Sequence, residues 1–117
     1  MIQGFYGNRT ITETTKEEIG WLLLGWIGDD GVKFGKLKDG DRYAIKKIEI
    51  PNTDYMMVYN PIVEEEVDKE KRNPWGYIPS LGIEIYSRCL ICRRGNDGDY
   101  KSLEVEDYEK VKEYMAE

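Results

Sequence analysis

The sequence predicts an α+β fold, in which a small curved antiparallel β-sheet or partly open barrel of about six or seven short strands is combined with two to three helices. Three observations support this class. Apolar residues recur at helical spacing near residues 15–27, 61–72 and 106–116. Short alternating apolar segments, separated by Asp-Gly and Gly-Asn turns, occupy most of the remaining chain. The 117 residues contain neither a repeat nor a low-complexity linker, so we expect residues 1–117 to form a single compact domain.

The N-terminal part begins with short strand candidates around the Gly7-Asn8 turn, and a helix is predicted near residues 15–27. The apolar stripe of this helix repeats at i, i+3, i+4, i+7 and i+8, at Ile19, Leu22, Leu23, Trp26 and Ile27. Gly20 and Gly25 each weaken such a helix by about 1 kcal/mol. A strand over residues 21–27 therefore remains the alternative.

The middle of the chain, residues 32–59, is predicted to be rich in strands. Alternating apolar residues at 32–37 lead into an Asp-Gly turn at Lys38–Asp41. A second alternation, from Tyr43 to Ile50, changes phase half-way, which indicates a bulge or a bend. A Pro-Asn-Thr-Asp turn then leads into a strand at residues 54–59.

A surface helix at residues 61–72 has the clearest local signal in the chain. Asn60 can cap it, and Pro61 occupies its first position, where a missing N–H costs nothing. Glutamates lie early and basic residues lie late, as the helix dipole favours, and Pro74 prevents continuation. The ten residues that follow the helix, NPWGYIPSLG, combine two prolines and two glycines with a Trp and a Tyr. We expect them to form an ordered but irregular connection.

Beyond this connection the sequence predicts a long strand from Ile83 to Arg93, a hairpin loop, a strand from Tyr100 to Val105 and a last helix near residues 106–116. Cys89 and Cys92 lie three residues apart on the long strand, so their side chains should point to opposite faces. One metal ion or one disulfide would hardly engage both. We therefore expect two buried structural thiols.

Residue types that carry common catalytic chemistry are missing. The chain has no His, which excludes Ser-His-Asp and Cys-His nucleophile systems and histidine-bearing zinc sites. No Gly-rich segment has the order of a phosphate-binding loop. Four aspartates lie in Gly-rich segments that are typical of turns, namely Asp29, Asp30, Asp39 and Asp41. We therefore predict no catalytic residue, no metal and no cofactor, and a carboxylate-dependent hydrolase is kept only as an alternative.

Charge and aromatic residues indicate a protein-binding role. The net charge is −6, of which residues 60–117 carry −5, and this balance is unfavourable for binding a phosphate backbone. Aromatic residues anchor protein interfaces, and in this chain they gather beside the acidic helix predicted at 61–72. The predicted partner-binding residues are Trp75, Tyr77, Tyr55 and Tyr59, with Glu64, Glu65, Glu66 and Asp68 steering toward a basic partner surface. In the alternative, Trp75 and Tyr77 fold back as lids over the edge of the core.

The sequence thus predicts a non-enzymatic, small acidic protein-binding module, a regulator or inhibitor of the type that viruses and mobile elements encode. The alternative is a small barrel that binds nucleotides or single-stranded nucleic acid through Arg88, Arg93, Arg94 and Tyr86. The start of the chain lacks the pattern of a signal peptide, and no apolar stretch is long enough to span a bilayer. We expect a cytoplasmic protein without membrane contact. The oligomeric state stays open, with a homodimer as one option.

Overall fold

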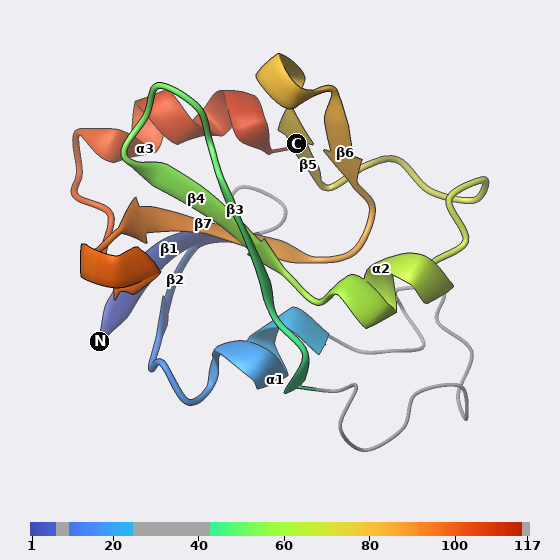
Figure 1. Ribbon diagram of the computed structural model, residues 1–117, viewed down its shortest axis with the longest axis horizontal. Helices are drawn as coiled ribbons and strands as arrows, with labels where there is room; N and C mark the ends of the chain where they lie inside the picture. The colour runs from blue at the N-terminus through green and yellow to red at the C-terminus, as the bar shows by residue number, and fades with distance from the viewer. Residues whose placement is uncertain (7–9, 25–42, 116–117) are drawn as a thin grey trace.

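The computed structural model describes residues 1–6, 10–24 and 43–115 (Figure 1). It confirms the predicted α+β class, because these residues form an antiparallel sheet that does not close into a barrel, together with three α-helices. Some predicted features lie outside the described residues: the Gly7-Asn8 turn, the strand at 32–37, the Lys38–Asp41 turn, and the aspartates 29, 30, 39 and 41. No helix in the described part of the chain is long and apolar enough to cross a membrane.

The main sheet is formed, within the described residues, by β1 (Ile2–Tyr6), β2 (Thr10–Thr14), β3 (Lys46–Glu49), β4 (Tyr55–Tyr59), β7 (Cys89–Arg94) and β8 (Tyr100–Lys101). Five of these strands lie in the order β2-β1-β7-β4-β3, and β8 pairs with β7. At the centre, Ile91 of β7 lies opposite Met57 of β4 on one side and Phe5 of β1 on the other. β3 and β8 are shorter than the strands predicted at 43–50 and 100–105.

Both faces of the sheet are covered. The inner strand β4 is therefore buried along its whole length. The odd-numbered residues of β4 enter one hydrophobic cluster and its even-numbered residues enter another. Cys89 lies in the first cluster and Cys92 in the second, which confirms the predicted opposite orientation of the two side chains. Both thiols are free and buried.

Helix α1 (Ile19–Leu24) covers the face of the second cluster, and this settles helix against strand for the described part of that segment. Ile19 and Leu23 lie one turn apart and are completely buried. The helix starts later than predicted, because residues 16–18 form a turn in which the Glu18 N–H binds the Thr15 carbonyl at 3.1 Å. Residues 25–27 of the predicted helix lie outside the described residues.

The other face is covered by two segments that are distant in sequence. One is α3 (Asp107–Val111), which continues into the 3₁₀ turn η5 (Lys112–Tyr114), close to the helix predicted at 106–116. The other is the hairpin of β5 (Gly76–Ile78) and β6 (Ile83–Ile85), joined by the 3₁₀ turn η3 (Pro79–Leu81). Figure 1 shows α3 and this hairpin on the opposite side of the sheet from α1. An isolated bridge between Gly76 and Met115 links the two segments.

Helix α2 (Pro61–Glu66) starts as predicted and ends too early. The Asn60 side-chain oxygen accepts the N–H groups of the second and third helical residues at 2.9 and 3.1 Å. The predicted extension to residue 72 is wrong, since Val67 is extended, with φ −69° and ψ 135°, and is buried in a third cluster. Asp68 then accepts the Glu70 N–H at 3.1 Å, so its side chain competes with helical hydrogen bonding.

The single long strand predicted from Ile83 to Arg93 is wrong, because the segment forms the two strands β6 and β7. The break is caused by α2. Its Glu64 carboxylate accepts the N–H of Tyr86 at 3.0 Å and the N–H of Ser87 at 2.7 Å. Once a side chain satisfies these backbone donors they need no neighbouring strand, and the chain leaves one sheet for the other.

Candidate functional site

Trp75 lies at the start of the β5–β6 hairpin and is held there by its backbone. Its N–H donates to the carbonyl of Ile85 at 2.7 Å, and the next residue, Gly76, pairs with both β6 and Met115. The indole ring is half-buried and packs against the cluster below α3. Trp75 is therefore neither a fully buried lid nor a fully exposed anchor, and Tyr77 is half-buried as well.

Gly76 allows the hairpin to approach the sheet closely. A Cβ atom at this position would lie 2.7 Å from the Cys89 sulfur and 3.0 Å from the end of the Met57 side chain. Any larger residue would push the hairpin away from the sheet. The position of Trp75 is thus fixed by close packing of the residue that follows it.

Two arginines flank the Trp75 ring. The Arg72 guanidinium carbon lies 5.2 Å from the ring centroid, and that of Arg88 lies 5.5 Å from it. Both distances lie within the range of cation–π attraction. Arg88 also donates to the Tyr6 phenol at 3.3 Å, so its guanidinium bridges the hairpin and the sheet.

A second cation–aromatic pair, like the first, lies in the part of the chain between α2 and β7. The Lys69 ammonium lies 5.6 Å from the ring centroid of Tyr86. The Tyr86 phenol donates to the Glu84 carboxylate at 2.8 Å, and this hydrogen bond, with burial and the Glu84 charge, raises the pKa of Tyr86. We refer to Lys69, Arg72, Trp75, Tyr86 and Arg88 as the Trp75 surface.

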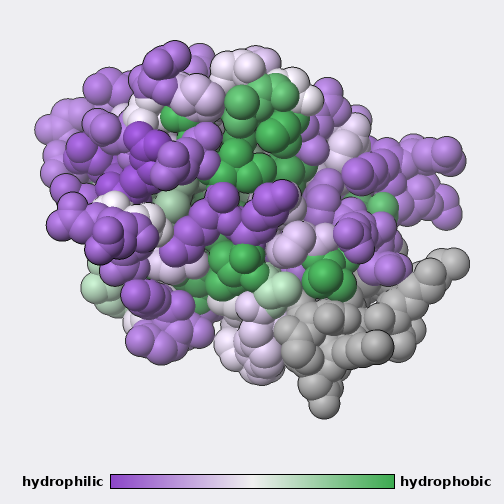
Figure 2. Space-filling view, viewed as in Figure 1, coloured by the Kyte–Doolittle hydropathy of each residue, from purple (hydrophilic) through white to green (hydrophobic). Residues whose placement is uncertain are grey.

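Apolar area adjoins the Trp75 surface. Figure 2 shows hydrophobic residues gathered over the β5–β6 hairpin, with hydrophilic residues around them. The 3₁₀ turn at the tip of the hairpin carries Leu81, whose exposed fraction is 45%. Half-buried Ile83 and Tyr77 belong to the same hairpin. Aromatic and arginine side chains are residue types enriched at protein interfaces, and here they adjoin the aliphatic side chains of the hairpin.

The acidic residues predicted to steer a partner have different roles in the structure. Glu64 is only 12% exposed in its side chain and binds the backbone of the β6–β7 break, which makes it a structural residue. Glu65 is exposed and Glu66 is half-buried on α2. Asp68 caps a turn and lies 3.6 Å from the Lys71 ammonium. Of this set, Glu65 has the most accessible carboxylate.

The tyrosines predicted beside Trp75 are not on the surface. Tyr55 is 6% exposed and Tyr59 is 7% exposed, and both side chains lie in the cluster below α3. They are the first and last residues of β4, an inner strand that is buried on both faces. Their rings therefore pack the core and do not extend the Trp75 surface.

Arg93 and Arg94, which the nucleic-acid alternative uses, lie at the end of β7 among carboxylates. Three carboxylates lie 3.7–3.9 Å from the Arg93 guanidinium, those of Asp54, Glu104 and Asp107. Arg94 lies 3.2 Å from the Glu49 carboxylate and donates to the carbonyl of Thr53. The structure thus separates these two arginines from Arg88, which contacts Trp75.

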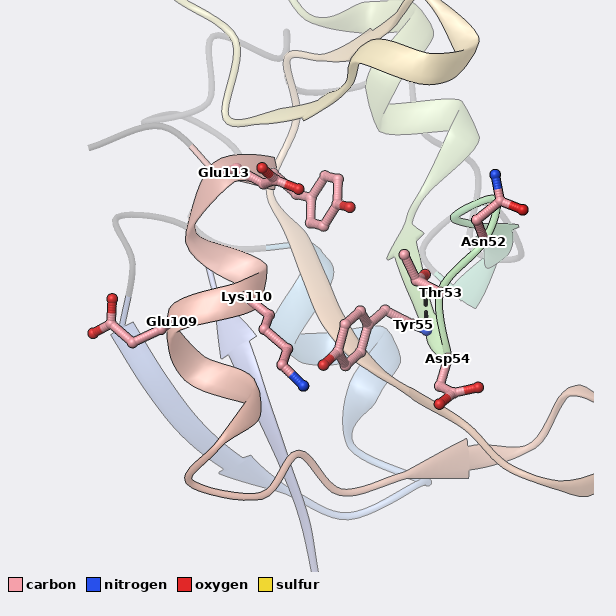
Figure 3. Close-up of a pocket in the computed structure, with 8 residues that line it drawn as sticks. Asn52, Thr53, Asp54, Tyr55, Glu109, Lys110 and Glu113 are labelled. Carbon is pink, nitrogen blue, oxygen red and sulfur yellow. Dashed lines mark hydrogen bonds between the residues drawn. The ribbon is translucent and has the colours of Figure 1, made fainter.

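A pocket of about 500 Å³ lies between the turn before β4 and the helical segment α3–η5 (Figure 3). Asn52, Thr53, Asp54 and Tyr55 line it from the first side, and Glu109, Lys110, Glu113 and Tyr114 line it from the second. In Figure 3 the Lys110 side chain reaches toward Tyr55, and Glu109 points to the outer side of the helix. The turn is held closed by Thr53, whose hydroxyl binds the Ile50 carbonyl and the Tyr55 N–H.

A buried hydrogen bond lies beneath this pocket. The Tyr55 phenol donates to Asp107 Oδ1 at 2.6 Å, and Asp107 Oδ2 accepts the Glu104 N–H at 2.8 Å. Burial opposes ionisation of Asp107, but these hydrogen bonds and the Arg93 charge outweigh it and hold the pKa of this carboxyl below its usual range. Burial, followed by the bond to Asp107, raises the pKa of Tyr55 to about 12. At neutral pH the pair therefore consists of a neutral phenol and a carboxylate.

Sequence reasoning missed two parts of these sites. Lys69 and Arg72 lie at the end of the helix predicted at 61–72, and their contacts with the rings of Tyr86 and Trp75 depend on the path of the chain after α2. The pocket had no local signal, because it joins the turn before β4 to a helix that begins at Asp107. No group of three or more Cys, Asp or Glu side chains within residues 1–6, 10–24 and 43–115 is arranged to hold a metal ion.

Comparison with known proteins gives no relative for this chain. No protein-family profile matches it, and neither the curated proteins nor the solved structures include a match. The class that the fold and the site define is therefore a small α+β domain with a preformed cation–aromatic surface and a separate polar pocket.

Proposed function

We propose that the protein is a non-enzymatic protein-binding module, a regulator or inhibitor whose contact is the Trp75 surface. One observation carries the proposal. The Trp75 ring is half-buried, and it is held by the core on one side and by the guanidinium groups of Arg72 and Arg88. The accessible part of such a ring can be contacted at low entropic cost, because little side-chain freedom is lost on binding.

The chemistry of the surface matches that of interface hot spots. Trp, Tyr and Arg dominate these hot spots, and their substitution by Ala commonly costs at least about 2 kcal/mol of binding energy. The Trp75 surface combines these types with the exposed Leu81 at the hairpin tip. A partner that covers this area would exclude water from ring and guanidinium groups together.

At long range, the net charge supports a basic partner, whereas the Trp75 surface itself carries the cations of Lys69, Arg72 and Arg88. The chain carries a net charge of −6. Exposed carboxylates lie outside that surface, on Glu65 of α2 and on Glu106 before α3. These charges steer a basic surface during encounter and set the association rate more than the final affinity.

The experiment compares two tryptophans. The purified chain, its Trp75→Ala variant and its Trp21→Ala variant are each used to capture proteins from cells of the source organism. Trp21 is the matched control, because it is 58% exposed and lies on α1, across the sheet from the hairpin. We expect a protein that is retained by wild type and Trp21→Ala and is lost with Trp75→Ala.

Calorimetry on the purified pair then measures the loss, which should be at least about 2 kcal/mol. A partner bound equally by wild type and Trp75→Ala, or one lost equally with Trp21→Ala, would refute the role of the Trp75 surface. Circular dichroism of both variants shows whether each remains folded.

A second candidate is the binding of nucleotides or single-stranded nucleic acid. It is favoured by the three cations that lie over the rings of Trp75 and Tyr86, because base stacking beside basic groups is the usual mode of such proteins. The ion pairs of Arg93 and Arg94 count against it. A mobility-shift titration with single-stranded oligonucleotides separates the two candidates, because only this one predicts affinity that falls steeply with salt.

A further inference from the structure

We propose that the pocket between the turn before β4 and α3–η5 receives the guanidinium group of an arginine side chain from a basic polypeptide. This inference rests on the proposed function in one respect, since it names the group through which a basic partner would be recognised. It concerns a different part of the molecule from the Trp75 surface, and it can be tested without the partner.

The shape of the pocket suits a side chain. Its volume of about 500 Å³ lies in the range of sites that hold small organic groups. Two phenol-bearing residues line it, Tyr55 from the strand and Tyr114 from η5. Tyr55 is fixed by its 2.6 Å bond to Asp107, so this part of the wall is rigid. Because Tyr55 is only 6% exposed, a planar guanidinium would stack on the half-buried ring of Tyr114.

The charge of the lining favours a cation. Three carboxylates line the pocket, those of Asp54, Glu109 and Glu113, against the single ammonium of Lys110. Asp54 is 78% exposed. The single positive charge of Arg93 is shared among Asp54 and two other carboxylates, so it neutralises only part of the Asp54 charge. Glu109 lies 2.7 Å from the Lys112 ammonium, which leaves Asp54 and Glu113 as the main attraction.

The charge of Lys110 has opposite effects on a bound cation and on a bound anion, so its removal tests which of the two the pocket binds. Its side chain reaches toward Tyr55 in Figure 3, and the residue is exposed, so a flexible stem can carry the ammonium away when another cation enters. For a guanidinium, Lys110 is an opposing charge. For an anion, Lys110 would be the attracting charge. Removal of the Lys110 charge therefore has opposite effects on the two kinds of ligand.

The occupant is an arginine side chain for a geometric reason. Its planar fork can donate two parallel hydrogen bonds to a rim carboxylate while its flat face lies on a phenol ring. A lysine ammonium has the charge and lacks the plane. A metal ion would need converging ligands, and the described residues hold no such group.

The test uses the ¹⁵N-labelled full chain and two capped tripeptides, Gly-Arg-Gly and Gly-citrulline-Gly. Citrulline keeps the shape of arginine and loses the charge. We expect the arginine peptide to shift the backbone amide signals of Thr53, Asp54, Lys110 and Glu113, and the citrulline peptide to leave them in place. Shifts that are equal for both peptides, or that arise only elsewhere on the chain, would overturn the inference.

Charge variants then show whether carboxylates attract the arginine peptide and whether Lys110 opposes it. We expect Glu113→Gln to weaken the arginine peptide about two- to fivefold and Lys110→Gln to strengthen it by a similar factor, the range for a partly exposed ion pair. Glu17→Gln is the matched control, because Glu17 is exposed and precedes α1 on the other face of the sheet. If Glu17→Gln weakens binding as much as Glu113→Gln, the attraction is general and the pocket is not the site. Weaker binding to Lys110→Gln would likewise reject a cation site.

The two proposals can fail separately. The peptide titration measures the pocket alone, and the capture experiment measures the effect of Trp75. A partner that depends on Trp75, together with a pocket that ignores arginine, would leave the proposed function in place and remove this inference.

Discussion

Replacing Tyr55 by Phe should cost about 2 kcal/mol of unfolding free energy, since it removes a single buried donor. The phenol lies 2.6 Å from Asp107 Oδ1, and both residues are only 6% exposed. A hydrogen bond to a charged group contributes about 1.5–3 kcal/mol. The lower part of this range applies, because the Asp107 carboxylate still has two partners in the variant. These are the Glu104 N–H at 2.8 Å and the Arg93 guanidinium at 3.8 Å. Phe fills the same space, so no cavity term is added.

Urea unfolding at pH 7, followed by circular dichroism, measures this cost. The matched control is Tyr108→Phe, which removes a phenol that donates to the uncharged Gln3 side chain at 3.0 Å. That bond is neutral and partly buried, so its loss should cost about 0.5–1.5 kcal/mol. A double-mutant cycle with Asp107→Ala isolates the pair, and the Tyr55→Phe penalty should largely disappear in that background.

The pH dependence of the penalty follows from the sign of the Asp107 shift. The folded protein holds the pKa of Asp107 below its value in the unfolded chain, which is about 3.9. Asp107 therefore contributes stability above that pH, and the contribution is lost as the pH falls through the folded pKa. The difference between wild type and Tyr55→Phe should be full at pH 7 and should shrink below about pH 4. A penalty that equals that of Tyr108→Phe, or that is the same at pH 7 and pH 3, would refute the charge-assisted bond.

Three further outcomes are expected. Glu64→Ala should destabilise the fold by about 2 kcal/mol in urea unfolding, because two backbone N–H groups lose their acceptor, whereas the exposed Glu65→Ala should cost less than about 0.5 kcal/mol. Gly76→Ala should cost about 1–3 kcal/mol in the same measurement through overpacking against the sheet, and an unchanged midpoint would contradict the packing described. Burial raises the pKa of both thiols, that of Cys92 to about 12, so labelling of Cys89 and Cys92 at pH 8 should follow unfolding; fast labelling of the folded chain would show that they are accessible.

The local parts of the fold could be predicted, because their causes are local. Asn60 caps α2 through its own side chain, as its position before Pro61 indicated. The opposite orientation of Cys89 and Cys92 follows from strand geometry alone. In the described part of the predicted stripe, Ile19 and Leu23 are buried as their spacing predicted and Leu22 is half-buried, whereas Trp26 and Ile27 lie outside the described residues.

The remaining parts could not be predicted, because their causes lie far away in sequence. The strand pattern of residues 83–93 is continuous, and the break arises from Glu64, a side chain on another element. The end of α2 is set by burial of Val67 in a cluster with Leu24. The helical pattern of residues 61–72 does not predict this contact, because Leu24 lies far away in sequence. Burial of Tyr55 reflects the central place of β4, which depends on pairing with both β3 and β7.

For the candidate site, the sequence predicts Trp75 as a contact residue, and the structure adds the residues around it. An aromatic residue between prolines and glycines is unusual, and the structure places Trp75 half-buried at the start of the β5–β6 hairpin. Its contacts with Arg72 and Arg88 depend on the path of the chain after α2 and on the break before β7. Neither is encoded in a short pattern around the tryptophan.

The order of strands in the sheet also determines when the protein can fold. β7 lies between β1 and β4, and its Ile91 is the residue that Phe5 and Met57 both face. Until β7 has been synthesised, β1 and β4 lack their inner neighbour, and α1 has no complete sheet on which to bury its stripe. The entropy cost of closing these long loops arises before the contacts stabilise the chain. We therefore expect refolding on the slow, millisecond-to-second scale of non-local β proteins. A nascent chain would expose its apolar strands until translation has passed Arg94, and chaperones would have access to it during that interval.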